Sequence, residues 1–85
     1  MNYEITHQPE QKLFQTEVED RNAFVQYRLV DGGLDIIHTI VPRPLEGRGI
    51  AAALVEAAYI YATAKGLQRK ATCSYAAKWL ERHPL

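Results

Sequence analysis

Two glycines and two arginines lie close together in the middle of the chain. Gly47 and Gly49 enclose Arg48, and Arg43 lies four residues before this group. We expect the glycines in the first turn of a helix, where they let the backbone approach a ligand and leave N–H groups pointing outward. The helix dipole and the two guanidinium groups add positive charge at the same place. Residues 47–51 therefore predict a site for a phosphate or pyrophosphate.

Two nucleotide-binding motifs can be tested against this stretch. The P-loop run Gly-x-x-x-x-Gly-Lys-Ser/Thr is absent from the sequence. Residues 47–52 formally match the Gly-x-Gly-x-x-Gly/Ala dinucleotide fingerprint. That fold needs a tight strand-to-helix turn and an acidic residue about 20 positions later. Here a proline-rich connection precedes the match and 33 residues follow it, too few for a doubly wound sheet, so this interpretation is rejected.

Cys73 and His38 have side chains suited to covalent or acid–base chemistry. Cys73 precedes a predicted helix, whose N-terminal potential favours a reactive thiolate, although a cysteine there can equally fill a small buried space. His38 lies in a predicted strand. Its neutral imidazole can accept a proton from an ammonium substrate, or it can lie half-exposed with a backbone partner. The residues alone leave both alternatives open for each side chain.

The histidines and the single cysteine do not predict a metal site. A metal needs two or more ligands at set spacing, and His7, His38 and His83 offer none. We expect His7 on the surface and His83 at a helix end. One cysteine excludes an internal disulfide and a cysteine-rich zinc site.

Three strands are predicted before the glycine stretch. Residues 12–19 alternate, with Phe14, Thr16 and Val18 on one face, and a polar turn at 20–22 follows. Residues 23–30 and 34–41 are apolar and β-branched, and Asp31-Gly32-Gly33 between them predicts a hairpin. These segments predict an antiparallel meander, and a short edge strand is expected around residues 3–6.

The strongest helix prediction covers residues 47–65, with Gly66 as its C-cap. Seven alanines between Ala51 and Ala64 give high helix propensity and allow close packing on a sheet. The predicted buried stripe contains Ile50, Ala51, Leu54, Ala58, Tyr61 and Ala62. The predicted opposite face contains Arg48, Ala52, Glu56, Tyr59 and Thr63.

A short strand and a last helix complete the predicted elements. The strand covers residues 71–73, and Ser74 is expected to cap a helix that runs to Arg82 and stops before Pro84. Tyr75 and Trp79 lie one turn apart in it. Strands, helix, strand and helix in this order predict an α+β fold with a helix on one sheet face.

Length and composition predict one globular domain over residues 1–85. The chain is 47% apolar and 24% charged, close to the globular average, which argues against disorder. No apolar run approaches the roughly 20 residues of a membrane span. The first four residues are not typical of a signal peptide, and a free cysteine suits a reducing compartment. We therefore expect a cytoplasmic protein that does not bind membranes.

The net charge of zero conceals two halves of opposite sign. Residues 1–42 carry three Lys/Arg and seven Asp/Glu, a balance of −4, whereas residues 43–85 carry seven and three, a balance of +4. The basic half contains the glycine stretch, which suits an anionic ligand, although solvated faces give the same pattern. The basic region Lys65, Arg69, Lys70, Lys78 and Arg82, with Tyr75 and Trp79 interleaved, raises nucleic-acid binding as an alternative. The zero net charge and the lack of a known module argue against it.

Four short motifs in order carry a resemblance to a known family. They are His38-Thr39-Ile40-Val41-Pro42, Glu46-Gly47-Arg48-Gly49-Ile50-Ala51, Thr72-Cys73-Ser74-Tyr75 and Arg82-His83-Pro84. Over residues 10–84 the chain resembles the short GNAT-type acetyltransferases, in particular the minimal N-acetyltransferase domain-containing subgroup. The resemblance implies a minimal antiparallel sheet of about four strands, a long helix after the glycine loop and a short C-terminal helix.

The resemblance also implies a ligand and its contacts. In that family the glycine loop binds the pyrophosphate of acetyl-CoA, which implies backbone contacts from Gly47, Arg48, Gly49, Ile50 and Ala51. The preceding strand would contact the pantetheine arm through Ile40 and Val41, and Arg43 lies beside the loop. The chain departs from the family pattern at Pro44, where Gln or Arg is usual, and at Ile40, where many subgroup members have Glu. The second change removes a carboxylate that would attract or deprotonate an amine.

The implied activity is transfer of an acetyl group from acetyl-CoA to an amine acceptor, which the sequence does not identify. In such folds the two strands ending near His38 and Cys73 separate around the acyl group, so the resemblance implies that these two side chains face one cleft. Cys73 would act as nucleophile or acid, and Tyr75 would protonate the leaving thiolate or only pack on Trp79. A non-catalytic acyl-CoA-binding or protein-interaction module is the alternative. Exposed edge strands are compatible with a monomer or a homodimer.

Overall fold

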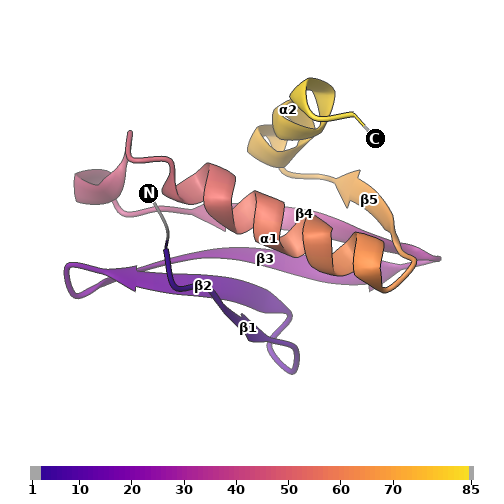
Figure 1. The fold of residues 1–85 in the computed structure, drawn as a ribbon, viewed down its shortest axis with the longest axis horizontal. Helices are drawn as coiled ribbons and strands as arrows, with labels where there is room; N and C mark the ends of the chain where they lie inside the picture. The colour runs from indigo at the N-terminus through magenta and orange to yellow at the C-terminus, as the bar shows by residue number, and fades with distance from the viewer. Residues whose placement is uncertain (1–2, 85) are drawn as a thin grey trace.

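The computed structural model describes residues 3–84 as a five-stranded sheet with two α-helices (Figure 1). The strands follow one another across the sheet as β1 (Thr6–Gln8), β2 (Leu13–Val18), β3 (Arg21–Val30), β4 (Gly33–Ile40) and β5 (Gln68–Ala71). A 3₁₀ turn (η1, Arg43–Leu45) leads to α1 (Ile50–Ala64), and α2 (Ser74–Arg82) follows β5. Neither helix among these residues is long and apolar enough to cross a membrane.

The α+β class is confirmed, and the sheet differs from the expected one in its last strand. β1 to β4 form an antiparallel meander, whereas β5 pairs with β4 in parallel. The sheet therefore has five strands rather than about four. β5 is parallel because α1 carries the chain back along the sheet before the strand begins, as crossover connections do.

Two tight turns set the register of the meander. Val18 pairs with Arg21, and Glu19 and Asp20 between them have φ of 53° and 63°. Such a two-residue turn matches the twist of the strands it joins. The expected polar turn at 20–22 is thus one residue too late, and β3 already begins at Arg21. The hairpin predicted at Asp31-Gly32 is confirmed, since Val30 pairs with Gly33.

A β-bulge changes the orientation of the end of β4. Gln26 pairs with His38 whereas Tyr27 pairs with Ile36, so Ile37 is an extra residue in β4. Val25 is buried and pairs with Thr39. Because paired residues point to the same face of a sheet, Thr39 lies on the face covered by α1 and His38 lies on the opposite face.

The core lies between α1 and the sheet. Val25, Tyr27, Leu34 and Ile36 from the strands meet Ile50, Leu54, Val55, Ala58 and Ala62 from α1, all of them buried. The prediction that Tyr59 lies on the outer face of the helix is wrong. Its side chain is 2% exposed and its hydroxyl donates to the Lys70 carbonyl at 2.5 Å. The reason is that β5 and α2 cover this flank, where the Tyr59 and Trp79 rings lie 5.7 Å apart.

The helix ends differ from the predicted ones at the N-terminal side. α1 begins at Ile50 rather than residue 47, because Gly47 and Gly49 have left-handed φ of 83° and 79°. Gly66 ends the helix as predicted, with φ of 72° and with the Leu67 N–H donating to the Ala62 carbonyl at 2.8 Å. β5 covers Gln68–Ala71, so the strand expected at 71–73 lies three residues too late.

The N-terminal edge holds an aromatic cluster. β1 lies at Thr6–Gln8, a few residues after the strand expected at 3–6. His7, which we expected on the surface, is half-buried, and its ring stacks on Phe14 with centroids 4.0 Å apart. Its Nε2 forms a 2.6 Å hydrogen bond with the Tyr27 hydroxyl, and the Tyr61 ring meets it edge-on at 4.4 Å.

Candidate functional site

The glycine loop borders a cleft at the N-terminus of α1, which we name the glycine-loop cleft. It encloses about 430 Å³. Its wall consists of Thr39 and Val41 at the end of β4, Leu45, Glu46, Gly47 and Gly49 in the loop, Ile50 and Ala51 in α1, and Tyr75 in α2. Five of the predicted ligand contacts, Val41, Gly47, Gly49, Ile50 and Ala51, are thus brought together around one space.

The N-terminus of α1 is open toward this cleft. Its first intrahelical hydrogen bond runs from the Ala53 N–H to the Gly49 carbonyl at 3.0 Å, so the N–H groups of residues 50–52 precede the helical ladder. Within residues 3–84 no side chain caps the helix, and its first turn contains no acidic residue. Free N–H groups and the positive end of a 15-residue helix are features that attract an anion.

A second hollow continues from the first along the two helices. This interhelix groove encloses about 450 Å³ and shares Gly49 and Tyr75 with the glycine-loop cleft. Its other walls are Ala52, Ala53 and Glu56 from α1 and Lys78, Trp79, Arg82 and His83 from α2. Small side chains on α1 leave the space open, and two cations lie along α2. The interhelix groove therefore carries two positive charges and, at Glu56, one negative charge.

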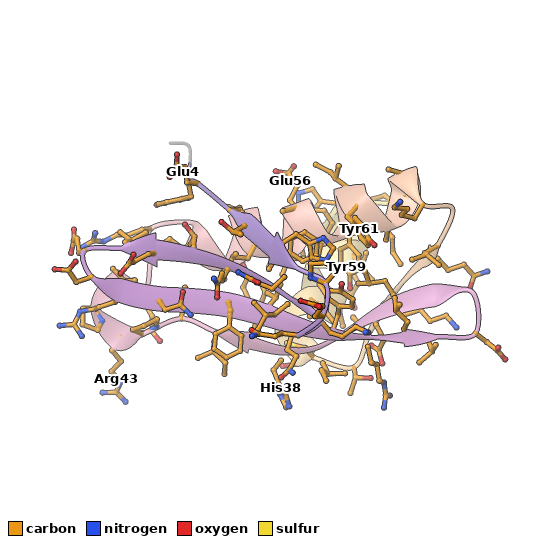
Figure 2. All side chains as sticks on the ribbon, turned by 90° about the horizontal axis from the view of Figure 1, so that it is seen from below. Glu4, His38, Arg43, Glu56, Tyr59 and Tyr61 are labelled. Atoms are coloured by element: carbon orange, nitrogen blue, oxygen red, sulfur yellow. The ribbon has the colours of Figure 1, made fainter. Side chains whose placement is uncertain are left out.

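The two arginines and Ile40 take up positions that the sequence did not predict. The Arg48 guanidinium pairs with Glu19 in the β2–β3 turn at 2.6 Å, and the Arg48 carbonyl accepts a hydrogen bond from Tyr3 at 2.6 Å. Figure 2 shows Arg43 on the side of the molecule that faces away from α1. The Ile40 side chain is 47% exposed and does not line the cleft. The charge of both arginines is therefore directed away from the open helix end.

Cys73 lines neither hollow, but it contacts Thr39, which lines the glycine-loop cleft. It is the N-cap of α2, and Ser74, expected as the cap, is the first helical residue. The Cys73 Sγ lies 3.3 Å from the Thr39 Oγ1. Burial raises the pKa of the thiol, whereas the Thr39 hydroxyl and the backbone N–H groups of Ala76 and Tyr75 lower it. The hydrogen bonds together outweigh burial, so the pKa of the thiol is below its ordinary value. These contacts therefore stabilise the thiolate more than the surroundings of an ordinary cysteine do.

His38 lies on the opposite face of the sheet from Thr39, the residue that contacts Cys73. The bulge at Ile37 turns it to the opposite face of the sheet, where it is exposed, and Figure 2 shows it pointing away from α1. The implied pairing of His38 with Cys73 is therefore wrong. Thr39 contacts Cys73 in place of His38. The β-bulge at Ile37 exchanges the two residues, and nothing in the sequence indicated this bulge.

Asp35 is a buried acid that the sequence reasoning passed over. Its carboxylate accepts hydrogen bonds from the Thr72 N–H at 2.7 Å, the Thr72 hydroxyl at 2.7 Å and the Arg28 Nε at 2.9 Å. Burial raises the pKa of Asp35, and these donors outweigh burial and hold it below its usual value. A charged residue inside the apolar segment 34–41 was the available signal, because such a group is buried only with partners.

The fold, the open helix end and the adjoining cleft define an acyltransferase-like domain, and comparison with known proteins assigns it. Residues 13–85 match the model of the GCN5-related N-acetyltransferase family. The chain therefore belongs to this family.

Individual proteins with known names or structures are also similar to the chain. Protein NATD1 from Xenopus tropicalis is 38% identical over 52 residues, which make up 61% of this chain and 48% of that protein, so the chain spans about half of its relative. The NMR solution structure of a GCN5-like protein from Staphylococcus aureus, described as a candidate N-acetyltransferase, superimposes with a TM-score of 0.73 and 32% identity. The match covers 95% of this chain and 80% of that one.

Proposed function

We propose that the chain binds acetyl-CoA and transfers its acetyl group to an amine acceptor. The observation that carries this proposal is the N-terminus of α1, which no side chain of residues 3–84 caps and which opens on a cleft also lined by Thr39 and Tyr75. Membership of an N-acetyltransferase family supports the same ligand and reaction class. The acceptor is an amine of unknown identity, and we expect the reaction in the cytoplasm.

The chain's residues suggest how the ligand is held. The N–H groups of residues 50–52 would bind the pyrophosphate, where the helix dipole favours negative charge. Val41 and the backbone before it would border the pantetheine arm. Lys78 and Arg82 in the interhelix groove would attract the remaining phosphate. This assignment replaces Arg43 and Arg48, whose side chains lie elsewhere.

The acetyl-CoA thioester supplies the acetyl group, and two side chains are placed to assist its transfer. Tyr75, 42% exposed, borders both hollows, so its hydroxyl can donate a proton to the departing thiolate. The lowered pKa of Cys73 suits attack on a carbonyl carbon better than proton donation. The catalytic roles of Cys73, Tyr75 and His38 stay predictions. Tyr75 lines the cleft and Cys73 contacts the cleft residue Thr39, whereas His38 lies on the other face of the sheet.

A calorimetric titration with acetyl-CoA tests the proposal. We expect binding to the wild-type chain and a loss of at least about tenfold in affinity in Gly49→Glu, because a carboxylate would face the site of the pyrophosphate. Gly49→Ala is the matched control. Both variants strain the same left-handed position, but only one adds charge.

Three outcomes decide between the functions. Wild-type binding that survives in Gly49→Ala and fails in Gly49→Glu supports the anion site. No wild-type binding at millimolar acetyl-CoA contradicts the proposal. Binding without release of CoA in the presence of any amine favours the non-catalytic acyl-CoA-binding module.

A further inference from the structure

The buried Asp35 has no part in the proposed ligand contacts, yet it is fully hydrogen-bonded. It is 5% exposed, and its two oxygens accept three hydrogen bonds from Thr72 and Arg28. Arg28 is largely exposed, so the pair reaches from the surface of the sheet to the buried carboxylate. We name the group Asp35, Thr72 and Arg28 the Asp35 clamp.

The clamp lies where β4 and β5 separate. Strand pairing ends at Ile36 and Ala71. The next two residues of the chain, Thr72 and Cys73, both donate their N–H groups to the Ile36 carbonyl, at 3.0 and 2.9 Å. Asp35 precedes Ile36 in β4, so the clamp holds the turn directly beside this shared carbonyl and fixes where the chain leaves the sheet.

Two candidate catalytic side chains follow this turn. Cys73 comes immediately after Thr72, and its carbonyl accepts the Ala77 N–H at 2.9 Å as α2 begins. Its Sγ contacts the Thr39 hydroxyl across the gap between β4 and β5. Tyr75, two residues further, borders both hollows. A shift of the turn by about 1 Å would change the distances of both side chains to the cleft, and displacements of this size affect catalysis strongly.

We propose that Asp35 is a positioning residue, which fixes the Thr72–Cys73 turn so that the thiol of Cys73 stays between Thr39 and the N-terminus of α2. The proposal rests on the proposed function in that Cys73 and Tyr75 are taken to act on the acetyl group. Asp35 itself touches neither ligand nor acetyl group. It acts through the turn.

Alkylation of the full-length chain by iodoacetamide across pH, without acetyl-CoA, tests the proposal. Cys73 is the only cysteine, so the modification reports a single thiol. In Asp35→Asn one acceptor oxygen is replaced by an NH₂ group that faces the donors of Thr72 or Arg28. At least one hydrogen bond of the clamp is therefore lost, and the turn is held less firmly. We expect the midpoint of the pH profile to rise by at least about half a unit, which is roughly threefold in thiolate at neutral pH.

The sign of the shift separates positioning from direct electrostatics. A carboxylate near a thiolate repels it, so removing the charge alone would lower the thiol midpoint. Loss of position would instead separate the sulfur from Thr39 and from the α2 N–H groups, and the midpoint would rise. A lowered or unchanged midpoint in Asp35→Asn therefore overturns the proposal.

Further variants keep the test decisive if Asp35→Asn folds poorly. Thr72→Val removes one donor of the clamp and should raise the midpoint by a smaller amount. Thr72→Ser keeps both donors and should have the wild-type midpoint. Val55→Ala is the control, because it removes buried side-chain atoms from α1 and so lowers stability without touching the turn. An equal shift in Val55→Ala would mean general loosening and would contradict the proposal. Failure of acetyl-CoA binding in the calorimetric titration would overturn the proposed function alone, because the alkylation profile needs no ligand.

Discussion

At the scale of single residues, the contact between Thr39 and Cys73 is the one that gives the thiol its character. The two residues are 34 positions apart in sequence, and they meet because β4 continues beyond the end of β5. A hydroxyl that donates to sulfur stabilises the thiolate more than the thiol. The reactivity of Cys73 thus depends on a neighbour from another strand as well as on its own helix.

Replacing Thr39 by Val should therefore raise the pKa of the Cys73 thiol. The variant keeps the shape of the side chain and removes the hydroxyl that lowers this pKa. We expect slower alkylation at neutral pH and a midpoint closer to that of free cysteine. The pH dependence of iodoacetamide modification measures it. Thr39→Ser, which keeps the hydroxyl, should behave as the wild type, and equal profiles for Val and Ser would show that the contact has no effect.

The site residues found from sequence alone were those whose chemistry is local. Gly47 and Gly49 need a left-handed backbone, and Cys73 precedes a helix, so neighbouring residues were sufficient to place them. The orientation of His38 and the partner of Arg48 depend on distant segments. A single extra residue at Ile37 reverses His38, and Glu19 from the β2–β3 turn takes the Arg48 guanidinium.

At the scale of elements, β5 is held between two neighbours by polar contacts that use its backbone. The Tyr59 hydroxyl of α1 donates to the Lys70 carbonyl. Asp35 of β4 accepts a hydrogen bond from the N–H of Thr72, the residue that follows β5. Burial, followed by the nearby Asp35 charge, raises the pKa of the Tyr59 phenol, so it remains a neutral donor. Hydrogen bonds from α1 on one side and from β4 on the other thus hold β5 and the residue that follows it.

Tyr59→Phe should destabilise the fold while leaving its packing intact. The ring stays in place, and the partly buried Lys70 carbonyl loses this donor, which costs about 1 kcal/mol in free energy of unfolding. Urea denaturation monitored by circular dichroism measures the change. Tyr61→Phe is the control, since its hydroxyl has no hydrogen bond within residues 3–84 and Figure 2 shows it on the same helix. A loss of equal size in both variants would contradict the role of the Tyr59 hydrogen bond.

The order and type of the elements followed from the sequence because hydrophobic periodicity and turn residues are local signals. The boundaries and the parallel pairing of β5 did not. A four-residue strand of Gln, Arg, Lys and Ala has no strand pattern of its own, and its place depends on α1 and β4. Tyr59 was assigned to the wrong face for the same reason, because only the folded chain shows that α2 covers this flank.

At the scale of the whole molecule, the His7 cluster joins the N-terminal edge of the sheet to the helix that carries the ligand site. His7 from β1 contacts Phe14 from β2, Tyr27 from β3 and Tyr61 from α1. Four elements therefore meet at one titratable ring. Burial lowers the pKa of this imidazole below 6.5, since a charged ring loses solvation among aromatic neighbours.

This lowered pKa makes the stability of the fold depend on pH in a defined direction. An unfolded chain binds a proton at His7 with a pKa near 6.5, whereas the folded chain resists protonation until lower pH. The unfolded state therefore holds more protons as the pH falls below about 6.5, and stability decreases until the pH passes the folded pKa. Above that window the contribution is fully present.

Urea midpoints between about pH 7.5 and pH 5.5 test this dependence, because the carboxylates with lowered pKa titrate below that range. His7→Gln provides the comparison, since its amide oxygen can accept from the Tyr27 hydroxyl and does not titrate. We expect the wild type to lose more stability than His7→Gln across the window, and the other histidines cancel because both proteins contain them. Parallel losses would mean that His7 is protonated as readily in the folded chain as in the unfolded one, and the aromatic cluster would then contribute packing without pH sensitivity.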